Sequence, residues 1–153
     1  PLRAAQDAVA LPLQKPPTRA ELEQTSAKAG STQKWVADQM LARLKAGETL
    51  PTQYRAPVVV WQFGGDLTLV GLPGEVVVDY VRLIEEAVGP LKLWLAAYCN
   101  DTFGYLPSAR VLREGGYETR GLYHGGIGYF APEAQEAMVG KVRELAGQAG
   151  RGR

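Results

Sequence analysis

The sequence predicts an α/β fold: a mixed sheet with a β-hairpin and a strand-helix-strand crossover, and flanking helices. Two observations support this prediction. Residues 56–72 contain two β-rich runs around a short Gly-containing connection, which is typical of a hairpin. Residues 67–99 then show the pattern strand, turn, helix and strand, an order that predicts a right-handed crossover between parallel strands.

Length and composition limit the possible classes of protein. The chain has 153 residues, 46% of them hydrophobic, which is enough for one compact core, so we expect a single domain over residues 18–147. The formal charge of +1 argues against a nucleic-acid partner. No run approaches the roughly 20 apolar residues of a transmembrane helix. The one cysteine, Cys99, excludes an internal disulfide and is interpreted as a packing residue.

The N-terminal region is expected to consist of an arm and two helices. Residues 1–17 carry four prolines, so they should form an extended arm over other structure. Thr18 and Glu21 match a capping box, which predicts a helix up to about residue 29. A second helix is expected over residues 33–46, with Gly47 ending it.

The turn after the hairpin is followed by an acidic residue, Glu75, at the expected start of a helix over residues 75–89. The β-branched run at residues 76–78 favours a strand locally, but the Gly89-Pro90 stop favours a helix. Glu75 has two interpretations. It can simply lie in the first turn, where the helix dipole stabilises its charge, or it can coordinate or catalyse at a strand end.

The next strand is expected over residues 91–99, and its mostly unbroken apolar run suggests burial on both faces. In a crossover, the ends of the two strands lie at the same edge of the sheet, which brings Glu75 close to the polar loop 100–108. Asn100 is expected to orient this loop through hydrogen bonds from its side chain to the backbone. A short helix, a last helix over residues 131–145 and a disordered tail at 148–153 should follow.

These residues carry a resemblance to a known family. The segments "GLPGE" (71–75) and "YCNDTFGYLPSARVLREGGYE" (98–118) resemble the C-terminal half of the catalytic domain in the neutral/alkaline (non-lysosomal) ceramidase family, amidases that cleave the N-acyl bond of ceramide. The resemblance covers about residues 57–145. It implies one catalytic zinc ion with Glu75 and Tyr105 as ligands, and residues 117–118 match a "YE" pair of the family.

The resemblance also implies that the site is incomplete in this chain. The family's other two zinc ligands are histidines far upstream of the glutamate, whereas the single histidine here, His124, lies downstream. A lone histidine in a Gly-rich loop is more often a surface or packing residue than a ligand. The chain is therefore expected to be a fragment or subunit of a larger catalytic domain, completed by an N-terminal portion that supplies two histidines.

Within the loop, Asn100, Asp101 and Thr102 are candidates for orienting the loop or the substrate. Thr102 stands where the family often has an aromatic residue, which bears on the shape of the acyl-chain pocket. Two functions remain open. The first is hydrolysis of the N-acyl amide of ceramide or a related lipid through a zinc-activated water, in a secreted or periplasmic enzyme by resemblance. The second is a metal-free interaction or scaffold domain of the same fold.

Overall fold

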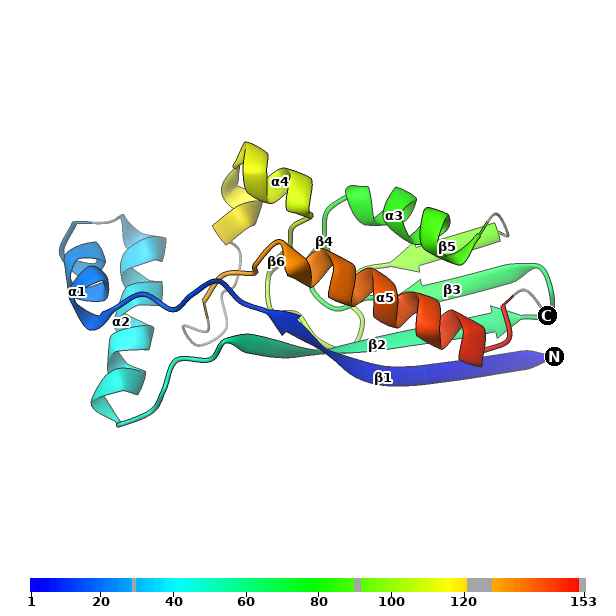
Figure 1. Cartoon of the computed structure of the whole chain (residues 1–153), viewed down its shortest axis with the longest axis horizontal. Helices are drawn as coiled ribbons and strands as arrows, with labels where there is room; N and C mark the ends of the chain where they lie inside the picture. The colour runs from blue at the N-terminus through cyan, green and yellow to red at the C-terminus, as the bar shows by residue number, and fades with distance from the viewer. Residues whose placement is uncertain (29, 90–91, 121–127, 152–153) are drawn as a thin grey trace.

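The computed structural model describes residues 1–28, 30–89, 92–120 and 128–151 and has an α/β fold around a four-stranded mixed sheet (Figure 1). The strand order is β1-β2-β3-β5. Antiparallel pairs join β1 to β2 and β2 to β3, and β3 is parallel to β5. The bounds are β1 (Leu2–Pro12), β2 (Gln53–Phe63), β3 (Leu67–Gly71) and β5 (Lys92–Ala96). The predicted hairpin and the parallel crossover pair are both confirmed.

Strand β1 lies in the region expected to be an extended arm. It pairs with β2 along its whole length, from Leu2 opposite Phe63 to Pro12 opposite Gln53. The strand is rich in alanine and poor in the β-branched residues that usually signal a strand. Its buried positions, Val9 and Leu11, alternate with more exposed ones, as expected for a strand with one face on the core.

A helical hairpin follows β1 and lies at the left end of the molecule in Figure 1. It consists of α1 (Arg19–Lys28) and α2 (Ser31–Lys45), packed around a small core of their own built on Leu22, Val36, Ala37 and Met40. The predicted capping box is confirmed, because the Thr18 amide and hydroxyl groups both donate to the Glu21 carboxylate, at 2.7 and 2.8 Å.

The main core lies between one face of the sheet and two helices, α3 (Asp79–Val88) and α5 (Glu133–Gln148). It contains Val58, Val60, Val70, Leu72, Tyr80, Ile84, Met138, Val142 and Leu145. On the opposite face, Trp61, Leu69 and Trp94 occupy one row across β2, β3 and β5. Trp94 is 61% exposed, so the expectation that residues 91–99 are buried on both faces is wrong. Within the described part of the chain, β5 is an edge strand that pairs with β3 alone.

The crossover differs from its prediction in where the helix begins. Residues Glu75–Val76 form a short strand, β4, and α3 starts only at Asp79. The β-branched run that follows Glu75 pairs in parallel with β6 (Tyr105–Leu106) instead of entering the helix. The interpretation of Glu75 as a first-turn residue of the helix is therefore wrong, and Asp79 occupies that turn.

The chain continues through α4 (Ala109–Glu114), the 3-10 helix η1 (Tyr117–Arg120) and α5 to a fixed C-terminal segment. Arg151, expected in a disordered tail, is only 8% exposed. Its guanidinium donates to the carbonyl oxygens of Val88 (2.8 Å) and Gly89 (2.7 Å), and to the hydroxyl of Thr68. This side chain therefore ties the C-terminal end of α5 to the end of α3 and to β3.

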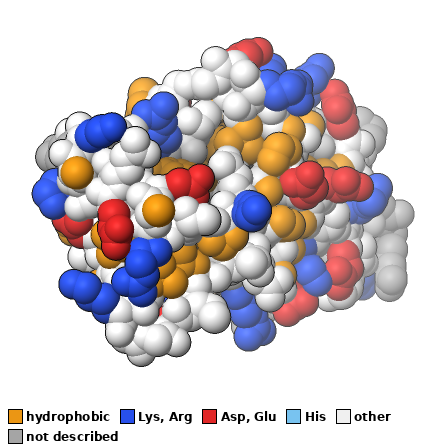
Figure 2. Space-filling view, turned by 60° about the vertical axis from the view of Figure 1, so that its left-hand side comes forward, with side chains coloured by type: hydrophobic (Ala, Val, Ile, Leu, Met, Phe, Trp, Pro, Cys, Tyr) orange, Lys and Arg blue, Asp and Glu red, His pale blue; other side chains and the backbone are white. Residues whose placement is uncertain are grey.

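Charge is mixed over the surface, in keeping with the formal charge of +1. On the face in Figure 2, basic and acidic side chains are interspersed, and hydrophobic side chains are exposed between them. None of the helices in the described part of the chain is both long enough and apolar enough to cross a bilayer.

Replacing Arg151 with alanine should destabilise the fold by about 2–3 kcal/mol, since it leaves buried acceptors without their charged donor. The measurement is the free energy of unfolding in urea. Arg143→Ala, on the exposed side of α5, is the matched control and should cost less than about 0.5 kcal/mol. Equal losses in the two variants would contradict a structural role for Arg151.

Candidate functional site

Backbone hydrogen bonds join the turn after β3 to the loop after β5. The amide of Gly74 donates to the Asp101 carbonyl (2.9 Å), that of Glu75 to Gly104 (2.7 Å) and that of Val77 to Leu106 (3.3 Å). In the other direction, the amide of Tyr98 donates to the carbonyl of Gly74 at 2.9 Å. The two strand ends therefore lie at one edge of the sheet, which confirms the placement that the crossover predicts.

Gly74 allows this close approach. Its φ is +65°, in the left-handed region, and a Cβ atom there would lie 2.6 Å from both the Gly104 carbonyl oxygen and the Phe103 ring. Only glycine satisfies both conditions at little cost. The close approach of the facing loop therefore requires glycine at position 74, directly before Glu75.

Glu75 and Tyr105 are Cα partners in the parallel β4-β6 pair. Their side chains interact, and Tyr105 also contacts Tyr117, with ring centroids 5.3 Å apart and planes at 84°. Hydrogen bonding to Tyr117, burial, and hydrogen bonding to Glu75 together raise the pKa of the Tyr105 phenol. The two candidate ligands are therefore direct neighbours, and Tyr105 carries its proton at neutral pH.

A third tyrosine, Tyr98, approaches Glu75 from the end of β5. A hydrogen bond to this carboxylate is the largest cause of the raised pKa of Tyr98. Its φ is +59°, a conformation that non-glycine residues rarely adopt and one that bends the chain out of the strand. The sequence pattern misses Tyr98, because it reads as one more residue of an apolar strand.

The pair lies in a hollow of about 430 Å³, hereafter the Glu75 hollow. Its walls include Glu75 and Tyr105 from the two short strands, Tyr117 and Glu118 from η1, and Arg110 from α4. Residues 117–118 are the ones that match the "YE" pair in the sequence. Carboxylate and phenol oxygens thus face a space large enough for a small ligand.

The other loop residues singled out from the sequence lie outside this hollow. Asp101 accepts a 2.5 Å hydrogen bond from the Tyr54 hydroxyl, and so anchors the loop to β2. Thr102 is exposed. Asn100 has a left-handed backbone, with φ of +66°, and its expected orienting role stays a prediction.

An ion pair forms the wall beside the Glu75 hollow. Arg110 contacts both carboxylate oxygens of Asp79, at 3.0 and 2.7 Å, and the Ser108 hydroxyl donates to Asp79 at 2.5 Å. Hydrogen bonds from Arg110 and Ser108 hold the pKa of Asp79 below its usual range. Ser108 also begins α4, where its side chain accepts from the amide of Val111. It therefore caps the helix and holds the Asp79 carboxylate.

The described residues supply only part of the ligand set of a metal site. Nowhere in residues 1–28, 30–89, 92–120 or 128–151 do three His, Cys, Asp or Glu side chains gather as metal ligands. Glu75 and Tyr105 offer two adjacent oxygen donors, whereas a catalytic zinc site needs about three protein ligands. They fit part of such a ligand set. His124, whose metal role was left open from the sequence, lies outside the described residues.

Comparison with models of known protein families gives no match, and comparison with curated proteins gives none either.

Gly74→Ala should destabilise the fold by about 3 kcal/mol or more, because it combines a left-handed φ with a clash against the backbone of Gly104. The matched control is Gly47→Ala, where φ is +80° but no atom lies within 4 Å of the added Cβ. That variant carries only the conformational cost, about 1–2 kcal/mol. Thermal unfolding followed by circular dichroism measures both, and similar losses would contradict the steric argument.

Asp79→Asn should lower the free energy of unfolding by about 1 kcal/mol at pH 7. The pKa of Asp79 is lower in the folded chain than in the unfolded chain, so its ionised form stabilises the fold above pH of about 4. That contribution is lost as the pH falls through the folded-state value. The difference between wild type and variant in urea unfolding should therefore shrink below pH of about 4. A difference constant from pH 7 to pH 3 would contradict this ionisation.

Proposed function

We propose that this chain is the C-terminal portion of a zinc-dependent amidase resembling neutral ceramidase, which hydrolyses the N-acyl amide of ceramide or a related lipid. The supporting observation is the register of β4 against β6, which makes Glu75 and Tyr105 direct neighbours. These are the two residues to which the resemblance assigns metal ligation. They come from segments about thirty residues apart and meet at the edge of the sheet.

The chemistry would require an N-terminal portion that supplies two histidine ligands. A zinc ion held there would supply a water of near-neutral pKa and a Lewis acid for the amide carbonyl. In this chain, Glu75 and Tyr105 supply oxygen donors from adjacent strands. Tyr117 and Tyr98 interact with this pair, and such neighbouring groups often govern the affinity of a site for its metal.

The Tyr105 phenol would also make metal binding depend on pH in this proposal. It is protonated at neutral pH, as tyrosine ordinarily is, and Tyr117, burial and Glu75 raise its pKa further. A cation placed beside it favours the phenolate, so metal uptake at Tyr105 and Glu75 would release a proton and weaken as the pH falls.

The test is the zinc content and amidase activity of the intact gene product, compared with its Glu75→Gln and Tyr105→Phe variants. Glu75→Gln should lose most of the zinc, and kcat on an N-acyl sphingosine substrate should fall at least 100-fold. Tyr105→Phe should cost at least about tenfold in zinc affinity. Zinc is measured by mass spectrometry of the dialysed protein.

Glu85→Gln is the matched control, since this glutamate is exposed on α3 and should change neither zinc content nor rate. Full zinc and full rate in both site variants would refute the assignment of these residues. An intact product without zinc or amidase activity would favour the metal-free interaction or scaffold domain instead.

A further inference from the structure

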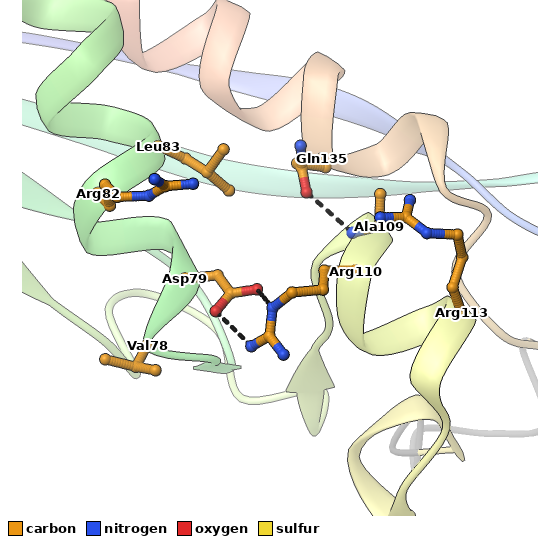
Figure 3. A pocket seen from close by; sticks show the side chains of 8 residues that line it. All are labelled: Val78, Asp79, Arg82, Leu83, Ala109, Arg110, Arg113 and Gln135. Atoms are coloured by element: carbon orange, nitrogen blue, oxygen red, sulfur yellow. Dashed lines mark hydrogen bonds and ion pairs between the residues drawn. The ribbon is translucent and has the colours of Figure 1, made fainter.

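A second hollow, hereafter the arginine pocket, lies between α3 and α4. Its volume is about 520 Å³, within the usual range of small-ligand sites. Arg82 reaches it from α3, Arg110 and Arg113 from α4, and Gln135 from α5 (Figure 3). Three helices thus bring guanidinium and amide groups to one hollow, and none of these residues was a candidate in the sequence.

The charges around the pocket are strongly unequal. Its three arginines face a single lining carboxylate, Asp79. Arg110 already neutralises Asp79 through contacts with both of its oxygens, drawn as dashed lines in Figure 3. Arg110 also pairs with Glu114, at 2.5 Å. Among the residues that line the pocket, Arg82 and Arg113 are the guanidinium groups that do not pair with Asp79.

Both of these guanidinium groups keep donors available. Arg113 has no hydrogen-bond or ion-pair partner among the described residues. Arg82 pairs with Glu86 at 3.6 Å, and both side chains are largely exposed, an arrangement that contributes little stability and is readily exchanged. At the pocket wall, the Gln135 Oε1 atom accepts from the Ala109 amide at 2.9 Å, which leaves its NH2 group as a further donor.

We propose that the arginine pocket binds an anionic group with several oxygen acceptors, a phosphate or a carboxylate. Guanidinium groups suit such anions, because their planar N–H donors form paired, charge-assisted hydrogen bonds with two oxygens. Arg110 forms part of the pocket wall and is already engaged with Asp79 and Glu114, so it adds no unpaired positive charge. Arg82 and Arg113 supply the attraction from opposite helices.

The pocket adjoins the Glu75 hollow. Val78, Asp79 and Arg110 line both spaces. One ligand can therefore place an anionic group between α3 and α4 and an amide bond near Glu75. This step rests on the proposed function, and it assigns to the amidase a substrate with a charged head group rather than neutral ceramide.

The first experiment titrates the chain with inorganic phosphate and, separately, with acetate, and follows backbone amide signals by NMR. The signals of Val78, Arg82, Ala109 and Gln135 should shift together. Arg113→Gln should weaken binding about tenfold, and rising chloride should weaken it further. The acetate titration distinguishes the two anion chemistries, and tighter binding of phosphate identifies it as the preferred group. Arg143→Gln, on exposed α5 surface, is the control and should bind as the wild type does.

Phosphate shifts of the same size around Arg143 and around the pocket would overturn the proposal, as would an Arg113→Gln affinity within twofold of the wild type. The second experiment compares phosphorylated and neutral N-acyl amides as substrates of the intact product. Arg113→Gln should lower kcat/KM about tenfold for the phosphorylated substrate only. Phosphate binding without any amide hydrolysis would refute the amidase and leave the anion site intact. Hydrolysis of the phosphorylated substrate that Arg113→Gln leaves unchanged would refute the pocket as the site of the substrate's head group and leave the amidase intact.

Discussion

The candidate site depends on the backbone pairing of residues 74–77 with the loop at residues 101–106. Strands β4 and β6 have only two residues each, too few to be stable as an isolated pair. The pair is stable here because the surrounding structure holds the loop at residues 101–106 in place. Phe103 packs edge-on against Tyr54 and Phe130, and Asp101 is bonded to Tyr54. The aromatic cluster thus fixes the loop, and the loop fixes Glu75 beside Tyr105.

The ion pair between Asp79 and Arg110 has a comparable role for the two hollows. It joins the first turn of α3 to α4 and forms part of the wall of both spaces. Without this ion pair, the ionised carboxylate of Asp79 would lie unpaired between the Glu75 hollow and the two arginines Arg82 and Arg113. With it, the Asp79 carboxylate is paired with a guanidinium, so the acidic side near Glu75 and the basic side near Arg113 remain distinct. The two spaces therefore favour chemically different parts of a ligand.

Elements defined by local signals could be predicted from the sequence. The hairpin follows from a Gly-containing connection between two β-rich runs, and the crossover follows from strand, helix and strand in order. Those two elements suffice to bring Glu75 near the loop after β5. The capping box at Thr18 is also local, because both partners lie within one helical turn.

Features that depend on distant partners could not be predicted. Strand β1 has an alanine-rich sequence, and its partner β2 begins about forty residues later. Helix α3 begins at Asp79, later than predicted, because pairing with β6 outweighs the helical signals around Glu75. Arg110 and Arg113 carry no motif, and only the packing of α4 beside α3 gives them a shared pocket.

The position of the first residue has a geometric consequence. The Gly64 amide donates to the carbonyl of Pro1, and Arg3 lies against Gly150, so both ends of the described chain meet where β3 begins (Figure 1). Glu75 follows the opposite end of β3. A polypeptide joined upstream of Pro1 would have to travel back roughly 20 Å, the span of about six extended residues, before it could reach the carboxylate. A histidine ligand supplied from upstream would therefore need a connecting segment that spans at least roughly 20 Å.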